Sequence, residues 1–186
     1  PVAMAHRDFF AMDTLCRISI DARYKDILPE AEKIVKEYEA RFSRHLSDSL
    51  LSQVNNDHMV TDEELAAIIR EYNSFSSAFK DVFSISLGAV SDAWNIAGGG
   101  TVPSQGELRK LVENATNTTL TVADNRVRRE GAGVIDLGGL LKGYICGQLS
   151  AFLRQQGVRR FIIDLGGNIA AYSHTAYTWK IGIMNP

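Results

Sequence analysis

The sequence has little cysteine: Cys16 and Cys146 are the only two among 186 residues. No Cys-x-x-Cys pair occurs, so the usual basis for a zinc site or a redox dithiol is missing. Each cysteine stands in an apolar periodic stretch, and we therefore expect two buried thiols that pack as small hydrophobic groups. Whether the two form a disulfide is left open by the sequence.

The chain also lacks an excess of charge of one sign. Its 20 Lys and Arg residues stand against 22 Asp and Glu residues, which gives a net charge of −2 and a pI near 6.1. Nucleic acids are held mainly through their phosphates by a positive surface, so we expect no nucleic-acid partner. The local cluster of Arg126, Arg128 and Arg129 is interpreted as a solvated strand face.

Long apolar runs are absent as well. No stretch approaches the about 18 apolar residues that a membrane-spanning helix needs. No charged region followed by an apolar one marks a signal peptide. The chain begins at Pro1 rather than at a methionine, and we interpret it as a processed or engineered product in which no export signal is visible.

What the sequence does contain is an alternation of helix and strand patterns. With 45% hydrophobic and 23% charged residues, it has the composition of a globular protein long enough for one domain with a core. We predict the fold class α+β (α/β), a single compact domain over residues 1–186 with a mixed sheet and flanking helices. Helices are predicted over 27–45, from the capping boxes Thr61–Glu64 and Ser104–Glu107, and over 140–153; strands over 14–20, in a hairpin at 119–127, and over 134–137, 161–163 and 179–183; a loop over 43–56.

The most informative pattern is a near-repeat, in which Ile-Asp-Leu-Gly-Gly occurs at 135–139 and again at 163–167. Each copy is a buried strand that delivers an aspartate and then two glycines. The first copy continues into a helix, and backbone N–H groups at a helix start suit a phosphate or pyrophosphate. Lys142 is predicted in the first turn of that helix, where a cation is unfavourable unless an anion lies beside it.

A simpler interpretation competes with the phosphate site. Asp136 and Asp164 can each cap backbone amides in a plain turn, with no ligand involved. Composition and spacing leave the two interpretations open. An actin-like ATPase turn fits poorly, because there the glycines lead into a second strand rather than a helix.

Beyond these patterns, the chain resembles the ApbE family of flavin transferases. Residues 135–144, read IDLGGLLKGY, are similar to the family's central signature, and the likeness extends in order along most of the chain. The other similar segments are Met12-Asp13-Thr14, Phe42-Ser43, 49–55, 83–94, Val102-Pro103-Ser104, 163–168 and 179–186.

The resemblance implies an enzyme that binds FAD and Mg²⁺ and moves FMN onto a threonine of a target protein, releasing AMP. Alternatives within it are a flavin-binding protein without transferase activity and an FAD pyrophosphatase. It also implies a periplasmic protein or a membrane-anchored lipoprotein. No catalytic residue is assigned. Matched position by position, the FAD contacts are Met12, His45, Val82, Phe83, Ser84, Asp136 and Lys142, and Gly139 offers a backbone carbonyl to the magnesium.

Some positions depart from the family pattern. Asp13 stands where glycine is usual, Ser84 where aspartate is usual and Ala89 where proline is usual. His45 occupies an often aromatic position. The family also continues into a segment that supplies an acidic metal ligand, and nothing in this sequence resembles it, so we expect a C-terminally incomplete chain or a second chain that supplies the segment.

Overall fold

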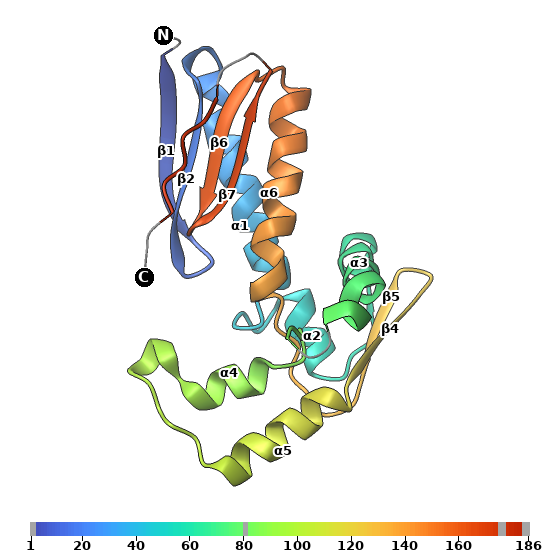
Figure 1. The fold of residues 1–186 in the computed structure, drawn as a ribbon. Helices are drawn as coiled ribbons and strands as arrows, with labels where there is room; N and C mark the ends of the chain where they lie inside the picture. The colour runs from blue at the N-terminus through green and yellow to red at the C-terminus, as the bar shows by residue number, and fades with distance from the viewer. Residues whose placement is uncertain (1–2, 80–81, 175–177, 184–186) are drawn as a thin grey trace. The chain divides into compact units, whose positions relative to one another are not determined.

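The computed structural model describes residues 3–79, 82–174 and 178–183 (Figure 1). Its contacts divide the chain into two compact units. The first unit comprises Pro1–Glu39 and Leu141–Pro186, and the second comprises Ala40–Leu140. The single domain expected over residues 1–186 stays a prediction.

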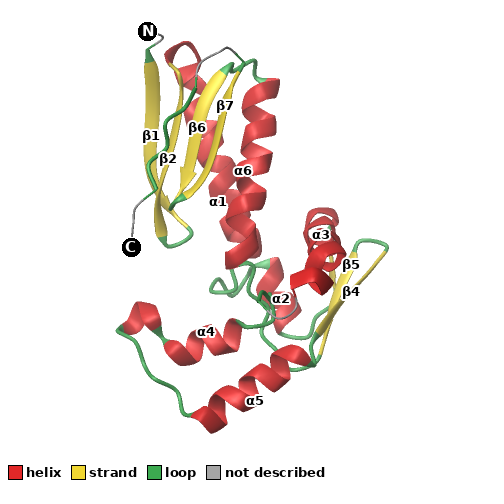
Figure 2. Ribbon diagram, in the orientation of Figure 1, coloured by secondary structure: helices red, strands yellow, loops and turns green. Residues whose placement is uncertain are grey.

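The first unit is a four-stranded antiparallel sheet with two helices along one face (Figure 2). Its strand order is β1-β2-β6-β7. The N-terminal hairpin β1-β2 therefore pairs with the C-terminal hairpin β6-β7 through the neighbouring strands β2 and β6. Along β6, buried and half-buried side chains alternate, as expected for a strand with one face on a core. The elements are β1 (Met4–Ala11), β2 (Thr14–Asp21), the 3₁₀ helix η1 (Ala22–Ile27), α1 (Leu28–Phe42), α6 (Gly138–Gln155), β6 (Arg160–Leu165) and β7 (Asn168–Ser173).

The core of the first unit lies between the sheet and the helices. Both helices turn apolar side chains spaced three and four residues apart toward the inner face of the sheet, and these side chains are fully buried. Burial of this apolar area is the main stabilising contribution to the unit. Its fully buried members include Ile18, Ile20, Val35, Ile145, Leu149, Phe161 and Ile163.

Two tight turns close the hairpins of this sheet. Gly166 and Gly167 have φ of 65° and 89°, and a Cβ atom on Gly166 would lie 2.3 Å from Thr14 Oγ1, so only glycine fits there. Met12 and Asp13 also have positive φ, 53° and 56°. A two-residue turn with this geometry favours Gly, Asn or Asp, which explains why Asp13 is tolerated where the family usually has glycine.

The second unit is mostly helical and carries a small sheet of order β3-β5-β4. Asp124 and Asn125 form its two-residue hairpin turn with φ of 48° and 61°, which confirms the hairpin predicted from the sequence. The elements are α2 (Leu50–Asn55), β3 (Val60–Thr61), α3 (Glu63–Phe79), α4 (Gly88–Trp94), the 3₁₀ helix η2 (Ile96–Gly98), α5 (Gln105–Thr116), β4 (Thr119–Ala123) and β5 (Arg126–Glu130).

The predicted α+β class and all four predicted helices are confirmed. The expected mixed sheet is not observed: the described strands form two antiparallel sheets, because neighbouring strands are joined mainly by hairpins. The strands β1, β3 and β7 were not predicted. Gly157, with φ of 80°, follows the end of α6 as the sequence predicts. Among the described residues, no helix is both long enough and apolar enough to cross a membrane.

Two helix starts differ from the prediction. The expected loop over 43–56 contains α2, because the Ser49 hydroxyl accepts a hydrogen bond from the Ser52 amide at 2.9 Å and caps that helix. At α3 the cap is Asp62 rather than Thr61. Asp62 Oδ1 accepts from the Leu65 amide at 2.8 Å, while Thr61 belongs to β3.

The strand predicted over 179–183 is wrong: these residues pair with no strand. The segment is held instead by a side chain, since Trp179 Nε1 donates to the Tyr172 carbonyl of β7 at 3.1 Å. The segment similar to the family extends to residue 186, and its last residues, 184–186, lie outside the described residues.

Replacing Ile18 with alanine should lower the free energy of unfolding by about 2–5 kcal/mol, because its side chain is fully buried and the change leaves a cavity. Ile183→Ala is the matched control, since Ile183 is 94% exposed and the same change should cost within about 0.5 kcal/mol. Urea unfolding followed by circular dichroism measures both. Equal losses in the two variants would contradict this placement of the core.

Candidate functional site

The first Asp-Leu-Gly-Gly unit forms a turn that opens α6. Asp136 Oδ1 accepts from the Gly138 amide at 2.7 Å, which satisfies one of the amides that a helix start leaves without a partner. Asp136 Oδ2 accepts from Arg44 Nε at 2.7 Å. Both carboxylate oxygens therefore have partners, and the aspartate is held in one orientation at the helix start. Since α6 begins at Gly138, Lys142 lies in its second turn rather than its first.

The segment before this turn is extended but is not the strand predicted over 134–137. Val134 makes one isolated parallel bridge to Leu87. The side chain of Asn55 then takes the place of a neighbouring strand: its Nδ2 donates to the Ile135 carbonyl at 2.9 Å, and its Oδ1 accepts from the Ile135 amide at 2.8 Å. On the other side, the Asp136 amide donates to the Ile85 carbonyl at 2.7 Å.

Arg44 connects this turn to α4. Its Nη1 and Nη2 donate to the two carboxylate oxygens of Asp92 at 2.9 and 2.8 Å, in addition to the bond from Nε to Asp136. The Arg44 side chain is only 10% exposed. Burial by itself would lower the pKa of this guanidinium, but the hydrogen bonds and charges of Asp92 and Asp136 outweigh burial and raise the pKa.

Gly139 packs directly against an aromatic ring. A Cβ atom at this position would lie 2.8 Å from Phe83 Cε2, which is closer than real contacts allow. The Phe83 ring in turn meets the Tyr72 ring edge to face, with centroids 6.1 Å apart. The glycine therefore allows α6 to start against the segment that carries Phe83.

That same segment lines a hollow of about 740 Å³ in the second unit. Three of the predicted FAD contacts, Val82, Phe83 and Ser84, belong to its lining. All lining side chains are uncharged, with hydroxyl and amide groups beside aromatic and aliphatic ones, a composition suited to a neutral ring system rather than to a phosphate. The lining residues are Tyr72, Asn73, Ser76, Ser77, 82–87, Val112, Ala115, Thr116 and 118–120.

The remaining predicted residues are distributed over both units. His45 is exposed in the turn after α1, where its amide donates to Ser43 Oγ at 3.2 Å. Met12 belongs to the first unit, and its amide donates to Glu39 Oε1 at 2.6 Å. Lys142 also belongs to the first unit and is half-buried. The second unit thus contains His45, 82–84, Asp136 and Gly139.

The second Asp-Leu-Gly-Gly unit is built differently from the first. Asp164 Oδ1 accepts from the Gly167 amide at 2.7 Å, but the two glycines turn a β-hairpin between β6 and β7. Both aspartates thus cap a backbone amide, as the simpler interpretation of the repeat proposed. Only the first copy adds a helix start to that cap, so the near-repeat in sequence is not a repeated site.

The two cysteines are buried and free, so the question of a disulfide is answered for this structure. Burial raises the pKa of both thiols, and the Lys142 ammonium opposes the rise at Cys16. The Cys146 thiol contacts the Asn168 carbonyl at 3.6 Å. These are packed thiols, as predicted.

Arg129 is not part of a solvated strand face, which corrects the sequence interpretation. Its side chain is 8% exposed. Nη1 donates to the Gly133 carbonyl at 2.7 Å and Nη2 pairs with Asp57. Arg129 therefore holds the loop that leads into the Asp136 turn, while Arg126 and Arg128 are exposed as expected.

The described residues do not form a magnesium site by themselves. Among them, no group of three or more His, Cys, Asp or Glu side chains is placed to hold a metal ion. Gly139 offers only a backbone carbonyl, and both oxygens of Asp136 are committed to Arg44 and Gly138. Magnesium prefers several oxygen ligands, so we assign no chemical step to it here.

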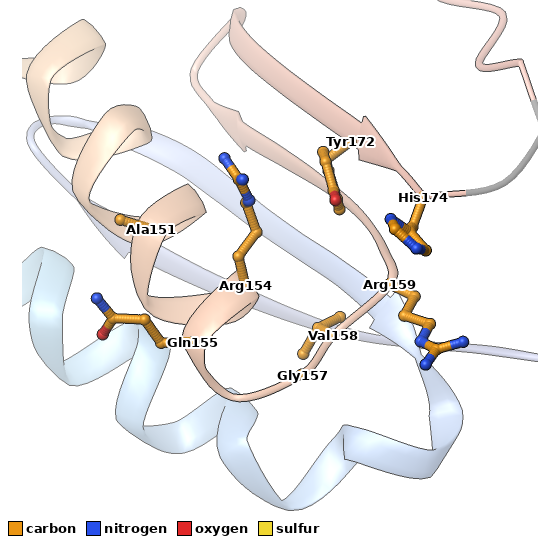
Figure 3. A pocket seen from close by; sticks show the side chains of 8 residues that line it. All are labelled: Ala151, Arg154, Gln155, Gly157, Val158, Arg159, Tyr172 and His174. Atoms are coloured by element: carbon orange, nitrogen blue, oxygen red, sulfur yellow. The ribbon is translucent and has the colours of Figure 1, made fainter.

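A second hollow, of about 530 Å³, lies at one end of the first unit (Figure 3). Arg154, Arg159, Tyr172 and His174 are among its lining residues, and none of the predicted site residues is. The Arg154 guanidinium lies 5.1 Å from the centre of the Tyr172 ring and stands in the last turn of α6, where a cation stabilises the helix end. Its charge is explained without a ligand.

Several residues of the Asp136 turn were missed by sequence reasoning. Arg44 and Asp92 lie 92 and 44 positions before Asp136 in the chain, and no spacing rule connects them. Asn55 stood within a matched family segment, but its pairing with Ile135 could not be read from that match. A buried arginine between two carboxylates has no local sequence signal.

Comparison with known proteins supports the resemblance. The ApbE family model matches residues 12–186. An FAD:protein FMN transferase of Klebsiella pneumoniae is 27% identical over 162 residues, covering 83% of this chain and 50% of the relative. The same enzyme of Treponema pallidum is 24% identical over 201 residues, covering 93% of this chain and 56% of the relative. The chain thus spans about half the length of these relatives.

Solved structures share the fold. The flavin transferase ApbE from Vibrio cholerae matches with a TM-score of 0.81 at 21% identity, covering 100% of this chain and 65% of that one. The ApbE protein of Thermotoga maritima also gives a TM-score of 0.81 at 21% identity, covering 91% of this chain and 59% of that one. Each relative is one longer chain, so the expectation of a separate second chain finds no support here.

Gly139→Ala should lower the free energy of unfolding, because the new methyl group meets the Phe83 ring at 2.8 Å and one of them must shift. Gly147→Ala is the matched control on the same helix. It has open space around it, and alanine there should raise stability by about 0.5–1 kcal/mol. Thermal unfolding compares the two, and a gain in stability for both variants would contradict the close contact.

Proposed function

Because the chain belongs to the ApbE family, we propose that it carries the FAD-binding part of an FAD:protein FMN transferase. In the proposed reaction, a threonine hydroxyl of a target protein loses its proton and bonds to the phosphorus of the FMN moiety. The pyrophosphate P–O bond breaks, and AMP leaves with the bonding electrons. The match of residues 12–186 to the family is the observation that carries this proposal.

The geometry of the second unit supports a binding role. The amides at the start of α6 and the fixed Asp136 turn offer the kind of site that accepts a pyrophosphate. The uncharged hollow lined by Val82, Phe83 and Ser84 offers a place for a ring of the dinucleotide. We propose His45, Met12 and Lys142 as further contacts on the strength of the family resemblance.

Magnesium dependence stays a prediction from the resemblance. When bound, Mg²⁺ would neutralise charge on the pyrophosphate. Gly139 would contribute a backbone carbonyl and no side chain. Removal of divalent metal with EDTA, followed by measurement of FAD affinity, tests the dependence directly.

The proposed transferase and its two alternatives differ in what they do to FAD. A flavin-binding protein without transferase activity would bind FAD and leave it intact, and an FAD pyrophosphatase would release FMN and AMP with no protein adduct. Incubation with FAD and a threonine-containing acceptor peptide distinguishes the three by mass spectrometry. A peptide with valine in place of the threonine is the control, since it keeps the shape and lacks the hydroxyl.

We also propose that the protein acts outside the cytoplasm, as a periplasmic protein or an anchored lipoprotein, on family resemblance alone. Cell fractionation of a tagged full-length gene product, compared with a cytoplasmic marker, is the direct test.

Lys142→Ala should weaken FAD binding about ten- to a hundredfold, because a hydrogen bond from a charged group to a phosphate contributes about 1.5–3 kcal/mol. Arg128→Ala should change the Kd less than about twofold, since Arg128 is an exposed residue of β5 that forms no part of the proposed site. Quenching of FAD fluorescence measures both. Equal effects on the Kd would contradict the placement of Lys142 at the pyrophosphate.

A further inference from the structure

We infer that Arg44, itself held by Asp92, is a positioning residue that fixes the Asp136 carboxylate at the start of α6. This inference rests on the proposed function for its consequence, which is tighter FAD binding. Its structural part concerns the second unit alone. Neither Arg44 nor Asp92 is among the residues for which the family resemblance implies an FAD contact.

Hydrogen bonds hold the Arg44 guanidinium on two sides. All three guanidinium nitrogens donate hydrogen bonds: Nε donates to Asp136, and Nη1 and Nη2 donate to the two carboxylate oxygens of Asp92. The bonds to Asp92 form a bidentate fork, the arrangement that fixes an arginine most firmly in angle as well as in distance. With its far side anchored on α4, the guanidinium presents Nε to Asp136 in one direction.

Arg44 is the more buried partner in both of its ion pairs. Arg44 is 10% exposed, whereas the Asp92 side chain is 55% exposed and the Asp136 side chain 29%. Removing one partner of a buried cation strongly destabilises the folded protein. Both ion pairs of the Arg44 guanidinium are therefore expected to persist. Asp92 is thus the outer anchor, and Asp136 is the half-buried group that the arginine holds in place.

The Arg44 ion pair restricts the carboxylate that caps the start of α6. Asp136 Oδ1 caps the Gly138 amide while Oδ2 is held by Arg44, so the carboxylate cannot rotate without losing one of the two bonds. Asp164 caps the Gly167 amide in the same way but in a hairpin, so Gly167 serves as an internal reference for the exchange of the Gly138 amide. A ligand that contacts Asp136 or the first amides of α6 then meets groups already in place, so less conformational entropy is lost on binding.

The experiment uses Asp92→Asn, which keeps the shape of the anchor and removes its charge, together with Arg44→Gln and Arg44→Lys. Asp124→Asn is the matched control, because it removes an exposed carboxylate of the same unit that pairs with Arg126 at 3.5 Å. Two quantities are measured in each variant: amide hydrogen exchange by NMR in the ligand-free protein, and the Kd for FAD.

We expect Gly138 exchange to become about tenfold faster in Asp92→Asn and Arg44→Gln, corresponding to about 1.4 kcal/mol, while Gly167 exchange stays unchanged. The FAD Kd should rise about three- to tenfold in both. Adding Asp92→Asn to Arg44→Gln should have little further effect, since Asp92 acts through Arg44. Arg44→Lys should recover part of the effect, because lysine keeps the charge and loses the fork.

Each measurement tests one part of the proposal. Gly138 exchange at the wild-type rate in both variants overturns the positioning role, and so does faster exchange at Gly138 and Gly167 alike, which reports general destabilisation. Faster Gly138 exchange with an unchanged Kd in a protein that binds FAD overturns the link to the ligand. A wild-type protein that binds no FAD contradicts the proposed function, and the Gly138 measurement still decides the structural part.

Discussion

The site in the second unit depends on one constraint: the extended segment 134–137 must satisfy its backbone hydrogen bonds without belonging to a sheet. The amide side chain of Asn55 meets both polar groups of Ile135, and the carbonyl of Ile85 receives the Asp136 amide. Each bond joins residues far apart in sequence. Because these partners come from α2 and from the segment before α4, the position of the Asp136 turn is fixed by elements on both sides of it.

That constraint separates two kinds of environment in the same unit. The Asp136 turn is charged and built around a buried guanidinium, and the exposed residues Gly138 and Gly139 follow it at the helix start. The hollow beside Phe83 contains no charged side chain. Gly139 brings the two together, since its missing Cβ lets α6 start against the Phe83 ring. A dinucleotide has the same division into a charged pyrophosphate and uncharged rings, and this correspondence supports the proposed FAD-binding role.

The sequence predicts those parts whose cause is local. The Asp124-Asn125 turn, the cap at Ser104 and the glycine after α6 were all correctly predicted, because each depends on residues within a few positions. The strands β1 and β7 were missed, since both are edge strands with mixed exposure and a weak alternation of polar and apolar residues. Within the site, the Asp136 turn and Gly139 were found from their motif. Arg44, Asp92 and the pairing of Asn55 were not, because their partners meet only in the folded chain.

The two Ile-Asp-Leu-Gly-Gly copies show how far a motif can carry a prediction. In both, the aspartate caps an amide two or three residues on. After the first copy comes Leu-Leu-Lys, which favours a helix, and Gly138 and Gly139 are its first residues. After the second comes Asn-Ile-Ala, which continues as a strand, so Gly166 and Gly167 take positive φ and turn the chain back. The pentapeptide therefore specifies the cap, whereas the residues that follow decide whether its glycines open a helix or close a hairpin.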